Sequence, residues 1–99
     1  MSNESKIQLD LNYSAFQSEL FDLDASEQKK IIKTFKKLRS MTWNELFKDH
    51  GLKWEQPRST PGKYTIRLSL SYRAVVMRDG SWMRFQTLHQ DHDSAYGKK

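Results

Sequence analysis

The segment that decides the fold is YTIRLSLSYRAVVMRDGSWMRFQ, residues 64–86. Apolar and polar side chains alternate along most of it, which is the period of a β-strand with one buried face. The pair Asp79-Gly80 lies between two alternating stretches and is a strong signal for a hairpin with a type I′ turn. We therefore predict three consecutive antiparallel strands in this segment.

Each predicted turn sets a register. If the Asp79-Gly80 turn pairs Arg78 with Ser81, the opposite pairs are Val76 with Met83, Val75 with Arg84, and Arg73 with Gln86. A three-residue loop over 69–71 places Arg67 directly opposite Arg73, whereas a two-residue loop places these two arginines on opposite faces. The apolar pattern favours the three-residue loop, because it directs the apolar side chains to one face together.

With this register the two faces of the sheet differ in chemistry. The face expected to pack against helices carries Tyr64, Ile66, Leu68, Tyr72, Ala74, Val76, Met83 and Phe85. The face expected to stay open carries Thr65, Arg67, Arg73, Val75, Met77, Trp82, Arg84 and Gln86.

The first half of the chain predicts one strand and three helices. Residues 6–12 alternate as a half-buried strand does. Three pairs then have the spacing of a capping box, namely Ser14 with Gln17, Asp24 with Glu27, and Thr42 with Glu45. We expect Gly51 to end the third helix from the C′ position.

The predicted fold class is α+β, with an N-terminal strand, two helices plus a short third, and then a three-stranded antiparallel meander. We expect all strands in one sheet with the helices on one face. A chain of 99 residues suffices for one modest core, so we predict a single domain over 1–99.

Charge and composition narrow the class of protein. Nine basic and nine acidic residues cancel in residues 1–55, so residues 56–99, with eight basic and three acidic, carry the formal charge of +5. This asymmetry favours a polyanionic partner such as nucleic acid. The lack of cysteine excludes disulfide and thiolate chemistry, and the short apolar runs and polar N-terminus predict a soluble cytoplasmic protein.

The arginines of the open face are candidates for binding phosphate, because a guanidinium donates two parallel hydrogen bonds to it. Arg67, Arg73 and Arg84 around one phosphate would also stabilise the charge that develops in phosphoryl transfer. Lys63 and Trp82 complete the predicted nucleic-acid-binding set, with Trp82 as the candidate for stacking on a base. The alternative is that these arginines pair with acidic neighbours or keep an exposed sheet soluble.

Other charged and aromatic side chains favour structural roles. The lysines of the second helix predict a solvated face, with a nucleic-acid contact as the alternative; they are Lys29, Lys30, Lys33, Lys36 and Lys37. His50, next to Gly51, suits the C-terminal end of a helix dipole. We assign Trp43 and Trp54 to the core or to the wall of a groove.

The segment after the last predicted strand gathers His89, His92 and Tyr96 with two aspartates. Imidazole exchanges protons near neutral pH, and a phenol stacks on bases or assists proton transfer. Acid–base work on a phosphodiester is one interpretation, and a structural tail of capped polar groups is another. The chain offers few ligands for a metal site, since it has three histidines in all and no cysteine.

Four stretches resemble the RelE/ParE superfamily of bacterial toxin-antitoxin toxins. They are Gly51-Leu-Lys-Trp-Glu55, Tyr64-Thr-Ile-Arg67, Ser71-Tyr-Arg73-Ala-Val-Val, and the closing His89 to His92-Asp-Ser-Ala-Tyr96. The order of predicted elements is also similar over nearly the whole chain. The resemblance to the RelE type implies an endoribonuclease without metal or cofactor that cuts mRNA in the ribosomal A site through the 2′-hydroxyl. It also implies a co-expressed antitoxin that covers the active face.

The resemblance implies roles for single residues. Arg73 resembles the arginine that holds the scissile phosphate, and Arg67 the upstream basic contact. Glu55 resembles the carboxylate base of the YoeB-like branch.

The C-terminal tail departs from the family pattern. Either His89 or His92 resembles the terminal histidine that acts as general acid in the family. Tyr96 stands near the sequence position of the family's terminal tyrosine. In the family these two residue types are adjacent at the very end, whereas here they are spaced, so the choice of histidine stays open. Two other classes also stay open, a ParE-like inhibitor of DNA gyrase and a non-catalytic nucleic-acid-binding module.

Overall fold

The computed structural model describes residues 6–57 and 61–90, which form an α+β fold. In chain order the elements are β1 (Gln8–Asp10), α1 (Ser14–Phe21), α2 (Ala25–Arg39), α3 (Trp43–Lys48), the 3₁₀ helix η1 (His50–Leu52), β2 (Lys63–Arg67), β3 (Tyr72–Asp79) and β4 (Trp82–Gln90). Within this described part, no helix has the length and apolar character needed to cross a bilayer.

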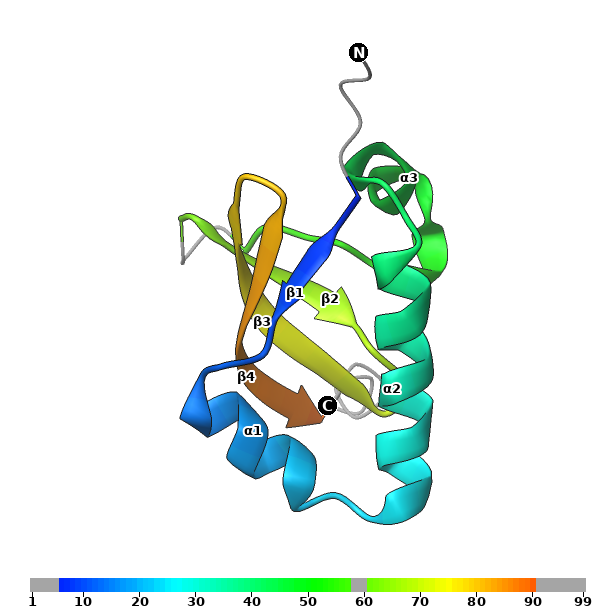
Figure 1. Ribbon diagram of the computed structural model, residues 1–99, viewed down its shortest axis with the longest axis vertical. Helices are drawn as coiled ribbons and strands as arrows, with labels where there is room; N and C mark the ends of the chain where they lie inside the picture. Colours follow the sequence, from blue (N-terminus) through cyan, green and yellow to red (C-terminus); the bar gives the residue numbers. More distant parts are fainter. Residues whose placement is uncertain (1–5, 58–60, 91–99) are drawn as a thin grey trace, which may run out of the picture.

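The four strands form one mixed sheet in the order β1-β4-β3-β2 (Figure 1). β2, β3 and β4 make the predicted antiparallel meander. β1 runs parallel to β4 at the sheet edge, so the sheet is not purely antiparallel. A parallel pair requires a long connection, and α1, α2 and α3 lie in the chain between these two strands.

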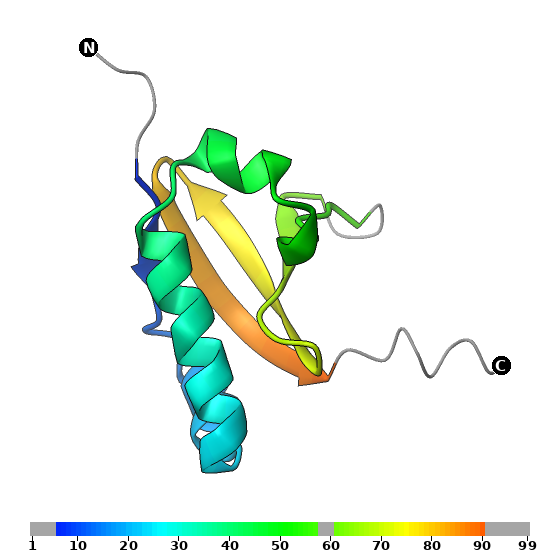
Figure 2. The same ribbon diagram turned by 90° about the vertical axis from the view of Figure 1, so that its right-hand side faces the viewer.

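The core fills the space between one face of the sheet and the helices α1 and α2, which lie on the same side (Figure 2). Phe16, Phe35 and Phe85 meet there with ring centroids 5.2 to 6.3 Å apart. Burial of each such side chain contributes roughly 1.5–3 kcal/mol. All eight meander residues predicted for this face are buried or pack against the core, so the predicted core face is confirmed.

Two of the three predicted helix caps are present. The Asp24 carboxylate accepts a hydrogen bond from the backbone N–H of Glu27 at the start of α2. Thr42 and Glu45 form a complete capping box at α3. Each cap stabilises its helix by about 1 kcal/mol, because it satisfies N–H groups that the helix leaves unpaired.

The predicted capping box at α1 is wrong. Ser14 is already the first helical residue, and Tyr13 occupies the N-cap without a side-chain hydrogen bond. The Gln17 amide donates instead to the carbonyl of Leu11. Its side chain therefore ties α1 to the segment that leaves β1.

The predicted end of α3 is also wrong. The helix ends at Lys48, and Gly51 belongs to η1. The Asp49 carboxylate accepts hydrogen bonds from two backbone N–H groups of η1, which draws the chain into a 3₁₀ turn. Lys53, with a φ of 49°, then turns the chain toward Glu55.

Candidate functional site

Three predicted site residues form a row across the open face of the sheet. Arg67 on β2 lies opposite Arg73 on β3, which confirms the register of the three-residue loop. On the other side of β3, Arg73 lies opposite His89 on β4. Neighbouring strands are about 4.8 Å apart, so this Arg-Arg-His row spans about 10 Å from Arg67 to His89. At the β2 edge, Arg67 also lines a hollow together with Lys37 and Leu52.

A β-bulge puts His89 on this face. The pairing of β3 with β4 shifts by one residue along the hairpin, which leaves Gln86 as the extra residue of β4. In an unbroken register Leu88 would lie opposite Arg73, and His89 would face the core. Instead Leu88 is 4% exposed and His89 is an exposed residue.

The predicted register of the second hairpin is wrong for two reasons. The loop consists of Gly80 and Ser81, one residue later than predicted, and only Gly80 has a positive φ, whereas a type I′ turn needs two. The bulge then adds a second shift. The observed pairs are Val76 with Phe85, Met77 with Arg84, and Arg73 with His89.

Glu55 lies at the outer edge of β2, beside the Arg-Arg-His row. Its backbone pairs with that of Thr65 through hydrogen bonds of 3.0 and 2.8 Å. Thr65 precedes Arg67 by two residues and lies on the same face. Backbone bonds therefore position Glu55, and its side chain stays 61% exposed.

Arg73 connects Glu55 to the row. Its Nη1 lies 3.6 Å from Oε1 of Glu55 and donates a hydrogen bond to Oγ1 of Thr65. The Arg73 side chain is only 18% exposed, so its surroundings restrict its rotamers. The ion pair with an exposed carboxylate contributes at most about 1 kcal/mol, so a phosphate can displace it.

Contacts on β4 hold His89. Its Nε2 lies 2.8 Å from Oγ1 of Thr87, two residues earlier on the same strand. The Glu19 carboxylate of α1 accepts a hydrogen bond from the backbone N–H of Leu88. Thr87 thus orients the imidazole, and Glu19 anchors the backbone that carries it.

The other predicted nucleic-acid contacts lie at the opposite end of the open face. Lys63, Met77 and Arg84 form a second row across the three strands. Met77 follows Arg73 by four residues of β3, which is about 13 Å along the strand. Trp82 is 39% exposed, and the Arg84 guanidinium lies 5.7 Å from its ring centroid. The three arginines are therefore divided between the two ends of the sheet rather than gathered around one point.

Arg84 pairs with acidic neighbours, so for this arginine the alternative interpretation of the sequence, a structural ion pair, is confirmed. Its guanidinium donates hydrogen bonds to Asp10 of β1 (2.5 Å) and to Asp79 at the turn (3.0 Å). The pKa of Asp10 is lowered, first by the backbone N–H of Asn12 and then by Arg84. The parallel pairing of β1 with β4 places Asp10 opposite Arg84, and local sequence patterns do not predict that pairing.

Trp43 and Trp54 pack against the core on the helix side of the sheet, which confirms their assignment. Trp43 is 4% exposed, and Trp54 stacks on Tyr64 with ring centroids 4.6 Å apart. The Arg78 guanidinium lies over Trp43 at 4.1 Å. His50 is exposed at the start of η1, not in the last turn of α3.

His92 and Tyr96 lie outside the described residues. Within residues 6–57 and 61–90, no three histidine, cysteine, aspartate or glutamate side chains gather as a metal site requires. Sequence reasoning assigned no role to Thr65, Thr87 or Glu19, which contact the site. For the two threonines the signal was present, since each lies two residues from a site residue on the same strand face.

The chain matches no protein-family model, no curated protein and no solved structure. Its motifs and the geometry of the open face are therefore the basis for assigning a function.

Proposed function

We propose that this protein is a RelE/YoeB-like toxin of a toxin-antitoxin system. It is a metal-independent endoribonuclease that cleaves mRNA on the ribosome, and a cognate antitoxin protein neutralises it. The observation that carries the proposal is the placement of Glu55, Arg67, Arg73 and His89 at one end of the open sheet face. Arg67, Arg73 and His89 come from three neighbouring strands, and Glu55 lies beyond the β2 edge.

Arg73 and Arg67 bind the scissile phosphate in this proposal. A guanidinium offers two parallel N–H donors to the non-bridging oxygens, and its charge stabilises the additional negative charge of the transition state. The bound phosphate displaces Glu55 from Arg73, because the two charged atoms are 3.6 Å apart and the carboxylate is exposed. Substrate binding thus releases the carboxylate that the reaction needs.

The chemical step uses Glu55 as base and His89 as acid. The 2′-hydroxyl oxygen attacks phosphorus while its proton passes to the Glu55 carboxylate. The bond from phosphorus to the 5′-oxygen breaks, and the protonated His89 gives its proton to that oxygen. The products are a 2′,3′-cyclic phosphate and a free 5′-hydroxyl, and each proton-transfer group supplies typically about 10²–10⁴-fold in rate.

The arrangement suits an in-line displacement, in which the attacking and leaving oxygens lie on opposite sides of phosphorus. Glu55 lies beyond the β2 edge, His89 lies on β4, and Arg73 lies between them on β3. Lys63, Arg84 and Trp82 lie further along the strands. There they would contact a neighbouring phosphate and base of the same RNA.

The test is to express the chain from a tightly repressed promoter and to map transcript ends by primer extension, with and without translation. We expect cuts within translated codons that disappear when translation stops. The His89→Ala variant should lose these cuts, and His50→Ala, a change at another exposed histidine, should keep them. Growth arrest without RNA cuts but with trapped cleaved DNA would contradict the proposal and favour a ParE-like gyrase inhibitor. Neither cuts nor arrest would favour a non-catalytic binding module.

A further inference from the structure

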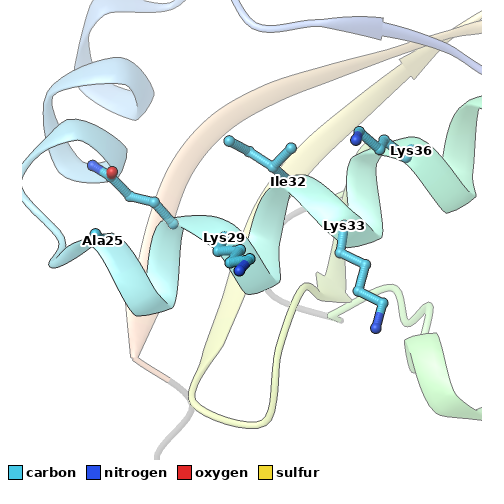
Figure 3. A pocket seen from close by; sticks show the side chains of 6 residues that line it. Ala25, Lys29, Ile32, Lys33 and Lys36 are labelled. Atoms are coloured by element: carbon cyan, nitrogen blue, oxygen red, sulfur yellow. The ribbon is translucent and has the colours of Figure 1, made fainter.

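The outer face of α2 carries a hollow on the side away from the core. It has a volume of about 560 Å³ and is lined by Ala25, Gln28, Lys29, Ile32, Lys33 and Lys36 (Figure 3). These residues recur at three- and four-residue spacing, so they form one stripe along the helix. The core residues of the same helix are Ile31, Phe35 and Leu38.

The lysines at this hollow differ from the other lysines of α2. Among the described residues, Lys30 pairs with Glu27 and Lys37 pairs with Asp49, and both lysines lie outside the hollow. The three lysines that line the hollow are exposed and form no ion pair within the described part of the chain; they are Lys29, Lys33 and Lys36. Lys29 and Lys36 are seven residues apart, about 10.5 Å or two turns along the helix.

An apolar side chain lies within this basic stripe. Ile32 is 46% exposed and stands on the outward side of α2, with Lys29 and Lys36 nearby (Figure 3). Gln28, which also lines the hollow, donates a hydrogen bond to the carbonyl of Phe21, and the Phe21 side chain is 68% exposed. A polypeptide that covers this stripe would remove the exposed apolar surface of Ile32 from water.

We propose that this stripe docks an acidic amphipathic helix of a partner protein. An apolar side chain of that helix packs on Ile32, and carboxylates one or two turns apart pair with the surrounding ammonium groups. Charge complementarity selects an acidic partner. The exposed isoleucine selects a polypeptide over a nucleic acid, because a phosphate backbone would neutralise the lysines but would put charged groups against Ile32. The proposal rests on the helix side of the molecule and is independent of whether the sheet cleaves RNA.

The test uses the full chain carrying His89→Ala and a labelled synthetic helical peptide. The peptide presents leucines on one stripe and glutamates on the flanking positions; a second peptide has each leucine replaced by glutamine at unchanged charge. We expect the leucine peptide to bind in fluorescence anisotropy and to shift amide resonances of residues 25–36. Ile32→Gln and the double variant Lys29→Gln/Lys36→Gln should each weaken binding at least about tenfold, which is about 1.4 kcal/mol. Lys30→Gln, which changes a lysine outside the hollow, should weaken binding less than about twofold.

Three outcomes would overturn the proposal. One is equal affinity for the two peptides, and another is an Ile32→Gln variant that binds like its parent. The third is an oligouridine that shifts the same amides more strongly than the leucine peptide does, which would assign the stripe to nucleic acid. The replaced side chains are exposed, and a melting curve for each variant verifies that it is folded.

Discussion

Arg73 is the residue through which the parts of the site meet. Its side chain contacts Glu55 and Thr65, and its strand neighbours are Arg67 and His89. Arg73 contacts the proposed base Glu55, and in the proposed reaction it also binds the scissile phosphate. Changes at its neighbours should therefore separate RNA binding from RNA cleavage.

Glu55→Gln tests this separation. The amide keeps the shape of the side chain but cannot accept the 2′-hydroxyl proton, so we expect single-turnover cleavage to slow at least about 100-fold. RNA affinity should stay equal or rise, because Arg73 loses a competing carboxylate. Filter binding measures the affinity on the same RNA. A parallel fall of affinity and cleavage would show that Glu55 supports the fold of the site and does not act as a base.

Asp10 makes stability depend on pH. Its pKa is lowered from the ordinary value of 3.8, so the ionised carboxylate stabilises the folded state above that pH and this contribution disappears as the pH falls through the lower folded pKa. We expect Asp10→Asn to lower the urea midpoint at neutral pH and to flatten its decline below about pH 4. Asp22→Asn, at an exposed aspartate, is the control and should follow the wild type. Identical acid profiles for all three proteins would contradict this role of Asp10.

Among the elements, the two hairpins show what a local pattern can predict. The first register was predictable, because only the three-residue loop turns Ile66, Leu68, Ala74 and Val76 to one side. In β4 the buried residues Phe85 and Leu88 are three positions apart instead of two. That spacing was the signal of a bulge, but alternation alone does not say where a register shifts, so the position of His89 opposite Arg73 could not be predicted.

Changes in the length of β4 test the bulge. Deletion of Gln86 removes the extra residue and leaves Leu88 and His89 in their places, so we expect a folded protein with cleavage activity within about tenfold of wild type. Insertion of one alanine after Gln86 moves Leu88 out of the core, which should cost about 2–5 kcal/mol and abolish cleavage. Urea unfolding and cleavage assays on both variants measure this. A folded but inactive deletion variant would show that the bulge shapes the site in another way.

Substitutions at Glu19 test whether α1 stabilises β4 through the hydrogen bond to Leu88. Glu19→Ala leaves the backbone N–H of Leu88 without this acceptor, and we expect a loss of about 1 kcal/mol with faster hydrogen exchange at Leu88. Glu19→Gln retains a carbonyl acceptor and should lose less. Equal exchange rates in the two variants and the wild type would exclude an anchoring role.

At the scale of the whole molecule, the helices cover one face of the sheet, and within residues 6–57 and 61–90 the opposite, basic face has no helix packed on it. The α+β class followed from capping spacings and alternation, and these are local signals. The parallel pairing of β1 with β4 is a contact between distant parts of the chain, and nothing within residues 6–12 encodes its direction. The pair between Asp10 and Arg84 was missed for the same reason. The basic charge of the second half is consequently less available to a ligand than its formal value suggests.

The salt dependence of RNA binding should reveal this difference in available charge. Lys63 and Arg84 flank Met77 in the same row, but Arg84 is already paired with two carboxylates. We expect Lys63→Ala to reduce the slope of log affinity against log salt by about 0.7, the value for one phosphate contact on a single strand. Arg84→Ala should reduce it by less. A larger change for Arg84→Ala would mean that RNA displaces both carboxylates.

The most direct test of the proposed active site is cleavage of a ribosome-bound mRNA whose scissile 5′-oxygen is replaced by sulfur. A thiolate leaves without a general acid, so this substitution bypasses the role assigned to His89. We predict that His89→Ala cleaves the sulfur substrate at nearly the wild-type rate but fails on the oxygen substrate, whereas Glu55→Gln is slow on both. The assignment of His89 as the general acid would be contradicted if the sulfur substrate restored cleavage only in His92→Ala, or if it did not restore cleavage in His89→Ala.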